Sequence, residues 1–269
     1  MLIPRIFTAL ILVAIVLGGL FYASGQTWLY GIIALALIAL FESARLSQIN
    51  HFSVQVLFAV LGSITLYFSL QYLSVLTFVL LTIIVLSTMI FVVYRYQRTQ
   101  GRIGLQSRFL MLGLNFLLVL VFTNAMLQLQ GKVSAGLLLL SMAIVWAMDT
   151  GAYFSGRAFG KRKLAKFVSP GKSWEGVWGG ALSAFVLSLL SLYFLLPEIS
   201  IQSLVGLSAM LTFIALLSVF GDLFESVLKR QANLKDSGKI LPGHGGILDR
   251  IDSLLVAMPL SYLLWLWYF

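Results

Sequence analysis

The sequence predicts an all-α, polytopic membrane protein with about nine transmembrane helices. Of its 269 residues, 60% are hydrophobic and only 10% are charged, and the mean hydropathy is +1.01. A soluble core cannot bury that much apolar surface without leaving large apolar patches in contact with water. Apolar runs of span length recur along the chain, and the basic residues fall between them. These observations predict a chain that is surrounded mainly by a lipid bilayer.

A helix that crosses the hydrocarbon core needs roughly 17–25 residues, most of them apolar. The apolar runs occupy residues 6–23, 28–41, 54–70, 75–94, 109–128, 134–156, 177–196, 203–221 and 253–269. The first run resembles a signal peptide, but many equally apolar runs follow it, so we interpret it as the first membrane helix. Trp265 and Trp267, near the end of the last run, are expected at the outer membrane interface.

The basic residues support this number of spans. If nine spans alternate in direction, every Lys and Arg except Lys132 falls on the same side of the membrane. The residues on that side are Arg5, Arg45, Arg95, Arg98, Arg102, Arg108, Arg157, Lys161, Arg162, Lys163, Lys166, Lys172, Lys229, Arg230, Lys235, Lys239 and Arg250. The positive-inside rule then places the amino terminus in the cytoplasm and the carboxyl terminus outside. The net charge of +9 therefore reflects topology, and we expect no nucleic-acid partner. Cysteine is absent, which excludes disulfides and thiolate chemistry.

Seven acidic residues lie in the second half of the chain, on or near the predicted cytoplasmic side. They are Asp149, Glu175, Asp222, Glu225, Asp236, Asp249 and Asp252. Residues 1–130 contain one acid, Glu42, which lies one helical turn from Arg45 and is most simply part of an ion pair at a helix end. We therefore predict scaffold helices in residues 1–130 and the catalytic site in residues 131–269, within one membrane-embedded unit.

The segment 222–252 has the densest group of charges. Asp222, Glu225 and Lys229 share one helical face, and residues 242–246 (PGHGG) provide permissive backbone that can approach an anion. Asp222 and Asp249 should meet at one membrane face because a short loop joins their helices. Carboxylates beside phosphates suit Mg²⁺, which takes one or two carboxylates and leaves positions for phosphate and water. The alternative for each acid is an interfacial ion pair with a nearby Lys or Arg.

A second candidate segment is SPGKSWEG at residues 169–176. Its first three residues predict a turn, and Ser173 predicts a helix cap, so that backbone N–H groups and Lys172 can hold phosphate at the start of the seventh helix. The GKS letters are similar to the end of a P-loop, but no strand and no earlier glycine at the required spacing are predicted before them. Asp149 is a further site candidate, and its alternative is an ion pair with Arg157.

These segments carry a resemblance to the phosphatidate cytidylyltransferase (CDP-diglyceride synthetase) family. The matching residues are SVLKR at 226–230, KD at 235–236 and HGGILDRID at 244–252. The second segment is similar to the family pattern S-P-x-K-[ST]-x-E-G, although some members have a second lysine where Gly171 stands. The resemblance implies nucleotidyl transfer from CTP to phosphatidic acid, which gives CDP-diacylglycerol and pyrophosphate. The two carboxylate clusters themselves predict Mg²⁺ as cofactor, with two divalent-metal positions expected and the number left open.

Roles for individual residues follow from these segments and the resemblance. The expected catalytic residues are Asp222, Asp249, Lys229, Arg230, Lys235, His244 and Arg250. Substrate phosphate is expected to bind Ser169, Lys172, Ser173, Lys229, Arg230, Lys235, Gly245, Gly246 and Arg250. Asp222 and Asp249 are the expected metal ligands, with Asp149, Glu175, Glu225 and Asp252 as further candidates. His244 is expected to orient phosphate, with or without exchanging a proton.

Two alternative functions have distinguishable chemistry. A polyprenol kinase also uses CTP but transfers the γ-phosphoryl group, so it releases CDP instead of pyrophosphate. A transporter would place ionisable groups near the midplane on broken helices, often in repeated halves, whereas the acids here cluster at one face in one half. We expect a protein of the bacterial cytoplasmic membrane with its site on the cytoplasmic face. The oligomeric state is left open, with a homodimer as one alternative.

Overall fold

The computed structural model describes residues 3–70, 72–241 and 243–269, and within α1 it describes the side chains of Thr8 and of residues 10–22. Pro242 of the predicted anion-binding segment, and the side chain of Arg5, one of the basic residues predicted on the cytoplasmic side, lie outside the described part. The elements are α1 (Ile3–Tyr22), α2 (Gly25–Leu46), α3 (Phe52–Ser69), α4 (Val75–Arg98), α5 (Arg108–Gln128), the π-helix η1 (Leu129–Val133), α6 (Ala135–Phe159), β1 (Lys163–Ala165), β2 (Ser169–Ser173), α7 (Trp174–Leu195), α8 (Ile201–Gln231) and α9 (Leu248–Tyr268). The predicted all-α fold is confirmed, since each predicted span coincides with one of these α-helices.

Length and composition agree with a membrane location. Eight helices, α2 to α9, are long and apolar enough to cross a bilayer, and the apolar segment Leu10–Tyr22 of α1 is shorter. Serine side chains begin many of these helices by accepting a hydrogen bond from a backbone N–H in the first turn, which is the preferred way to satisfy those donors. The capping residues are Ser24, Ser74, Ser107, Ser134, Ser173 and Ser200.

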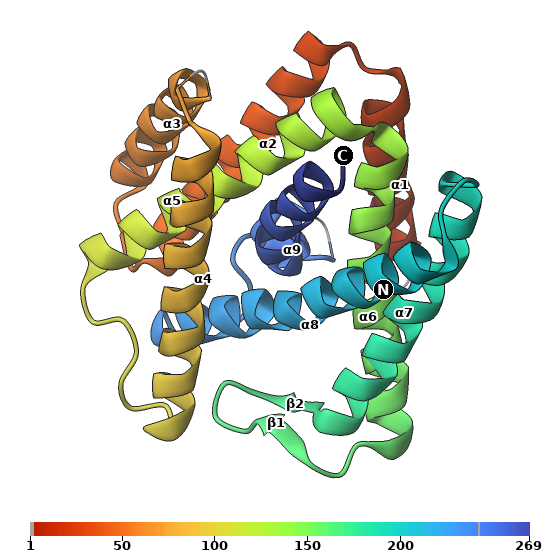
Figure 1. Cartoon of the computed structure of the whole chain (residues 1–269). Helices are drawn as coiled ribbons and strands as arrows, with labels where there is room; N and C mark the ends of the chain where they lie inside the picture. Colours follow the sequence, from red (N-terminus) through yellow and green to blue (C-terminus); the bar gives the residue numbers. More distant parts are fainter. Residues whose placement is uncertain (1–2, 71, 242) are drawn as a thin grey trace.

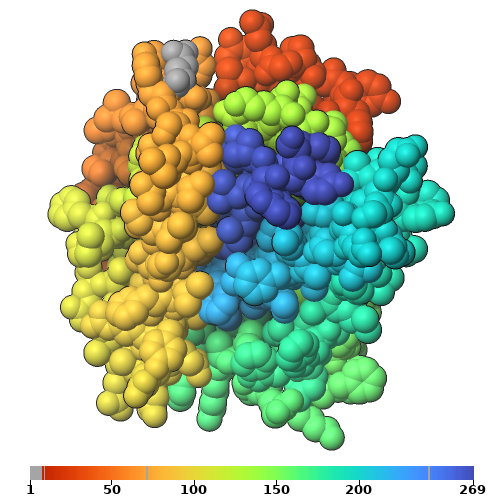
Figure 2. Space-filling view, viewed as in Figure 1, coloured from red at the N-terminus to blue at the C-terminus, as the bar shows by residue number. Residues whose placement is uncertain are grey.

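Helix α9 lies in the middle of the helical assembly (Figure 1). Its neighbours include α5, α8, α6 and α2, and side chains fill the space around it between α4 and α8 (Figure 2). Trp265 is 0% exposed and donates a hydrogen bond from Nε1 to Ser141 Oγ at 3.0 Å. The expectation that Trp265 marks the membrane interface is therefore wrong, because this face of α9 packs inside the protein. Trp267, on the other face, is 70% exposed.

A short β-hairpin precedes α7. Strands β1 and β2 pair antiparallel, with Lys163 opposite Ser173 and Ala165 opposite Ser169. The predicted turn at residues 169–171 is wrong, because these residues form β2 and the turn comes just before them. A two-stranded sheet has only edge strands, where Pro170 removes no required ladder hydrogen bond. The hairpin is held to α4 by a hydrogen bond from Phe167 N to Gln97 Oε1 at 2.9 Å.

Helices α8 and α9 cross in close contact at Gly221. A Cβ atom at this position would collide with the backbone of Asp252 and would lie 3.2 Å from Ser253 Cα. Backbone cannot move aside as a flexible side chain can, so a larger residue would push α9 away from α8. The neighbouring Asp222 and Asp252 therefore owe their proximity partly to this glycine.

We expect Gly221→Ala to destabilise the protein by about 1–3 kcal/mol, the usual range for overpacking, and to impair any activity that needs Asp222 and Asp252 together. Thermal unfolding in detergent measures the first effect. The matched control is Gly206→Ala in the same helix, where a Cβ meets nothing within 4 Å. Equal melting temperatures for the two variants would contradict the close crossing.

Candidate active site

A cavity of about 570 Å³ opens between α6, the hairpin, α7, α8 and α9. It combines acidic, basic and small residues from both candidate segments. Its predicted site residues are Asp149, Ser169, Lys172, Ser173, Asp222, Asp249, Arg250 and Asp252, and it is also lined by Met148, Ala152, Tyr153, Gly156, Arg157, Gly171, Gly176, Val177, Val219 and Ser253. The sequence therefore identified most of the charged lining of this cavity.

Three helices contribute acids that face one another in the cavity. Asp149 comes from α6, Asp222 from α8 and Asp252 from α9. Asp222 interacts electrostatically with both of the other two. Like charges held this close repel unless a cation lies among them, so the arrangement is suited to attract one.

Lys172, on β2, is the cation nearest to these acids. Its Nζ lies 2.5 Å from Asp222 Oδ2, and it also interacts with Asp149 and Asp252. The next residue, Ser173, caps α7 by accepting a hydrogen bond from Gly176 N at 3.2 Å, as predicted. The hairpin and this cap thus place Lys172 at the cavity wall.

The alternative ion pair between Asp149 and Arg157 is not formed among the described residues. Arg157 instead donates a hydrogen bond from Nη1 to Tyr153 Oη at 3.3 Å. Asp149 is therefore free of a partner on its own helix, and its carboxylate borders the cavity. This geometry favours the site interpretation of Asp149.

Asp249 borders the cavity but already has several hydrogen-bond donors. Its Oδ1 accepts from Lys229 Nζ at 2.8 Å. Its Oδ2 accepts from Ser237 N and Ser237 Oγ at 2.9 Å each, and from Gly246 N at 2.8 Å. Asp249 therefore holds the α8–α9 loop against the start of α9, in addition to any contact with a ligand.

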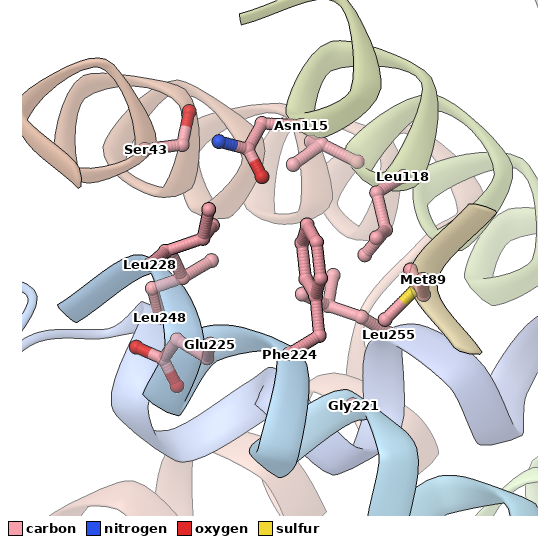
Figure 3. Close-up of a pocket in the computed structure, with 11 residues that line it drawn as sticks. Ser43, Met89, Asn115, Leu118, Gly221, Phe224, Glu225, Leu228, Leu248 and Leu255 are labelled. Carbon is pink, nitrogen blue, oxygen red and sulfur yellow. The ribbon is translucent and has the colours of Figure 1, made fainter. Parts of the chain in front are cut away.

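Glu225 and Lys229 form a buried pair beside the cavity. Lys229 Nζ lies 3.6 Å from Glu225 Oε2 as well as 2.8 Å from Asp249. Neither Lys229 nor Glu225 is among the residues that line the large cavity. Glu225 borders a second cavity of about 20 Å³, lined mainly by apolar side chains together with Ser43 and Asn115 (Figure 3). A direct substrate contact by Lys229 stays a prediction, whereas its ion pairs are part of the structure.

The other predicted residues lie outside the cavity lining. They are Arg230, Lys235, His244, Gly245, Gly246 and Glu175. Glu175 accepts hydrogen bonds from the backbone N–H groups of Lys161 and Arg162, and its Oε1 lies 3.4 Å from Arg162 Nε. His244 contributes its carbonyl oxygen, which accepts from Arg250 Nε and Nη2 at 3.1 and 2.8 Å. This contact fixes Arg250 at the cavity edge, and the predicted roles of these residues remain untested.

One residue of the site region was misinterpreted from sequence. The predicted ion pair between Glu42 and Arg45 is wrong, because no such pair occurs in the described part of the chain. Glu42 is buried and contacts the α8–α9 loop instead. The available signal is that Glu42 is the single acid of residues 1–130, because an acid among membrane helices is costly unless it has a specific partner.

The cavity suits a hard divalent cation. Its acids offer the oxygen ligands that Mg²⁺ prefers, and Asp149, Asp222 and Asp252 lie close enough to interact. In the described residues no three His, Cys, Asp or Glu side chains converge closely enough to hold a metal by themselves. Mg²⁺ usually takes one or two protein carboxylates together with phosphate and water, so the acids of the cavity are donors of the kind it would use.

The fold defines an integral membrane protein with a charged cavity between α6, the hairpin, α7, α8 and α9. Comparison with known proteins gives the particular family: residues 3–268 match the model of the cytidylyltransferase family. The chain belongs to this family and is a nucleotidyltransferase.

Individual relatives agree with the family match. The chain is 40% identical to a phosphatidate cytidylyltransferase of Pseudomonas aeruginosa over 271 residues, which cover 98% of this chain and 97% of that protein. It is 55% identical to the phosphatidate cytidylyltransferase of Haemophilus influenzae over 129 residues, 46% of this chain and 43% of that protein. The protein of the same name from Bacillus subtilis is 47% identical over 121 residues, 45% of this chain and 44% of that protein.

Proposed function

We propose that this chain is a phosphatidate cytidylyltransferase, which converts CTP and phosphatidic acid into CDP-diacylglycerol and pyrophosphate. A phosphate oxygen of phosphatidic acid forms a bond to the α-phosphorus of CTP, and the bond from that phosphorus to the β-phosphate bridging oxygen breaks. The observation that carries this proposal is the cavity in which Asp149, Asp222 and Asp252 meet Lys172 and Arg250. The names of the relatives support the same reaction.

The chemistry needs charge compensation more than it needs a strong base. Phosphatidic acid is ionised at neutral pH, so its attacking oxygen requires no deprotonation. Both substrates are polyanions, however, and they repel each other. Lys172 and Arg250, at the cavity wall, can offset this repulsion and stabilise the charge that develops on the pyrophosphate leaving group.

Mg²⁺ is the cofactor that the acids would hold, with Asp222, Asp252, Asp249 and Asp149 as the residues in reach of the cavity. When bound, it would neutralise phosphate charge and orient the reacting groups. Lys172 occupies part of this acidic surface through its ion pair with Asp222. Lysine is also a common ligand of phosphate, so a phosphate that enters the cavity can compete with Asp222 for Lys172.

The proposed location is the bacterial cytoplasmic membrane, with the cavity open to the cytoplasmic side. The positive-inside pattern supports this orientation, since the basic residues near the cavity, Arg157, Lys172 and Arg250, belong to the side that it assigns to the cytoplasm. Phosphatidic acid then arrives within the inner leaflet and CTP arrives from solution, so neither has to cross the bilayer. The homodimer that the sequence analysis leaves open as one alternative also stays a prediction.

One assay tests the function. Detergent-purified protein is incubated with phosphatidic acid, Mg²⁺ and CTP labelled either at the α- or at the γ-phosphate. We expect α-label in the lipid phase and γ-label in pyrophosphate. Transfer of the γ-label to lipid, with release of CDP, would instead identify a lipid kinase. No Mg²⁺-dependent transfer of either label to lipid would contradict the proposal.

A further inference from the structure

Glu42 has no place in the reaction scheme, although it is among the most buried charged residues of the chain. It belongs to α2, in the first half of the sequence, and is 1% exposed. A buried carboxylate is costly unless donors surround it. Its contacts therefore indicate what it does.

Among the described residues, the Glu42 carboxylate accepts hydrogen bonds from the α8–α9 loop and the start of α9. Its Oε1 accepts from Ile247 N at 3.1 Å, and its Oε2 accepts from Leu248 N at 2.8 Å. These N–H groups belong to the first turn of α9, which has no side-chain cap of its own at Ile247. An acid at a helix amino terminus satisfies such donors and interacts favourably with the helix dipole. Glu42 therefore acts as a cap supplied from a distant helix.

The loop is shaped to receive this carboxylate. A Cβ at Gly246 would lie 2.5 Å from Glu42 Oε2 and 2.6 Å from Oε1. A Cβ at Gly238 would collide with Oε1 and lie 2.7 Å from Glu42 Cδ. The two glycines thus leave a space that the end of the Glu42 side chain fills.

Ser237 connects Glu42 to the active site. Its Oγ lies 3.1 Å from Glu42 Oε2 and 2.9 Å from Asp249 Oδ2. The hydroxyl has one proton, so it can donate to one of these carboxylates at a time. Each carboxylate also accepts two backbone N–H groups of the loop and the start of α9. Asp249 accepts those of Ser237 and Gly246, and Glu42 accepts those of Ile247 and Leu248.

We propose that Glu42 is a positioning residue for the reaction described above, and this inference rests on that proposed function. By capping α9 and holding the loop, Glu42 sets the position of Asp249, Arg250 and Asp252, which line the cavity from the first turns of α9. Glu42 acts on these residues through Ser237, Ile247 and Leu248. Glu42 itself is not among the residues that line the cavity.

Glu42→Gln is the first test, because it keeps the size of the side chain while replacing one acceptor oxygen with a donor that opposes a backbone N–H. In the liponucleotide assay we expect the half-saturating Mg²⁺ concentration to rise about 10-fold or more, which is the range for a residue that orients metal ligands. A mere loss of folded protein would lower the rate without moving this concentration. Glu42→Asp should lie between wild type and Glu42→Gln. The control is Glu198→Gln, an exposed acid between α7 and α8.

A second readout needs no activity. The chain has no cysteine, so Ile247→Cys introduces a single thiol at the start of α9 while keeping the backbone N–H that Glu42 accepts. We expect maleimide to label this thiol at least about 10-fold faster when Glu42→Gln is added, because the start of the helix then opens more easily. A thiol at the exposed Lys239 position should label at the same rate in both backgrounds.

Equal labelling at position 247 with and without Glu42→Gln would overturn the positioning role, whatever the wild-type activity. If the wild type forms no liponucleotide, the proposed function fails, and labelling alone still decides the role of Glu42. The space at Gly238 allows a further test with two variants. Gly238→Ala should accelerate labelling at position 247, because its Cβ would collide with the Glu42 carboxylate. Adding Glu42→Asp should reverse part of this acceleration, because the shorter side chain withdraws the carboxylate. An unchanged or larger acceleration in the double variant would contradict the contact.

Discussion

Asp222→Asn is expected to lower turnover by about 10²–10³-fold, corresponding to the several kcal/mol that a charge-stabilising group contributes in an active site. Asp222 is the acid that interacts with both Asp149 and Asp252, and its carboxylate contacts Lys172 at 2.5 Å. The asparagine side chain has the same shape but no charge. It therefore removes attraction for a cation and the ion-pair partner of Lys172 together.

The measurement is the initial rate of CDP-diacylglycerol formation over a range of Mg²⁺ concentrations. Since Asn is isosteric with Asp, the melting temperature should change little, which separates this loss from unfolding. Asp252→Asn, from the opposing helix, should show a similar loss, and Glu198→Gln should behave as wild type. Normal turnover of Asp222→Asn at limiting Mg²⁺ would show that this carboxylate holds no metal.

The fold could be predicted in outline because the bilayer imposes a simple rule. A spanning helix must be apolar over a fixed length, so the spans followed from hydropathy alone. The rule does not state which face of a span meets lipid and which meets protein. Hydropathy therefore predicts an interface position for Trp265, whereas its side chain is buried against Ser141. The division into residues 1–130 and 131–269 stays a prediction, although the Glu42 contacts tie the two parts together.

For the site, the sequence predicted most of the charged residues that border the cavity, but not the contacts that each of them makes. Asp222, Asp249 and Asp252 belong to one segment with fixed spacing, and they do border a common cavity. The number of donors around each acid depends on the path of the α8–α9 loop, which no periodicity describes. Asp249 has donors on both oxygens, whereas Asp222 faces Lys172. The contacts of Glu42 could not be predicted for the same reason, since its partners lie far along the chain.

Lys229, which the sequence predicts as a catalytic residue, forms ion pairs that are expected to stabilise the fold. Its ammonium lies between Asp249, at 2.8 Å, and Glu225, at 3.6 Å, and its side chain is mostly buried. Removing one partner of a buried ion pair typically costs about 3–5 kcal/mol, because the remaining charge is left uncompensated. Here two carboxylates lose the same cation. The cost should fall mainly on Glu225, because its other close charged neighbour is the acid Asp252, whereas Asp249 keeps donors from Ser237 and Gly246.

We therefore expect Lys229→Met to lower the free energy of unfolding by about 3–5 kcal/mol, with loss of activity, as measured by thermal or denaturant unfolding in detergent. Lys239→Met, which removes an exposed lysine of the α8–α9 loop, is the control and should leave stability unchanged. Adding Glu225→Gln to Lys229→Met should restore part of the stability, because it removes the buried charge that has lost its partner. A stability within 1 kcal/mol of wild type for Lys229→Met, or a double variant less stable than the single one, would show that the ion pair is not what Lys229 contributes. If Lys229→Met lost activity at unchanged stability, the result would instead support direct phosphate binding by Lys229, as its sequence motif suggests.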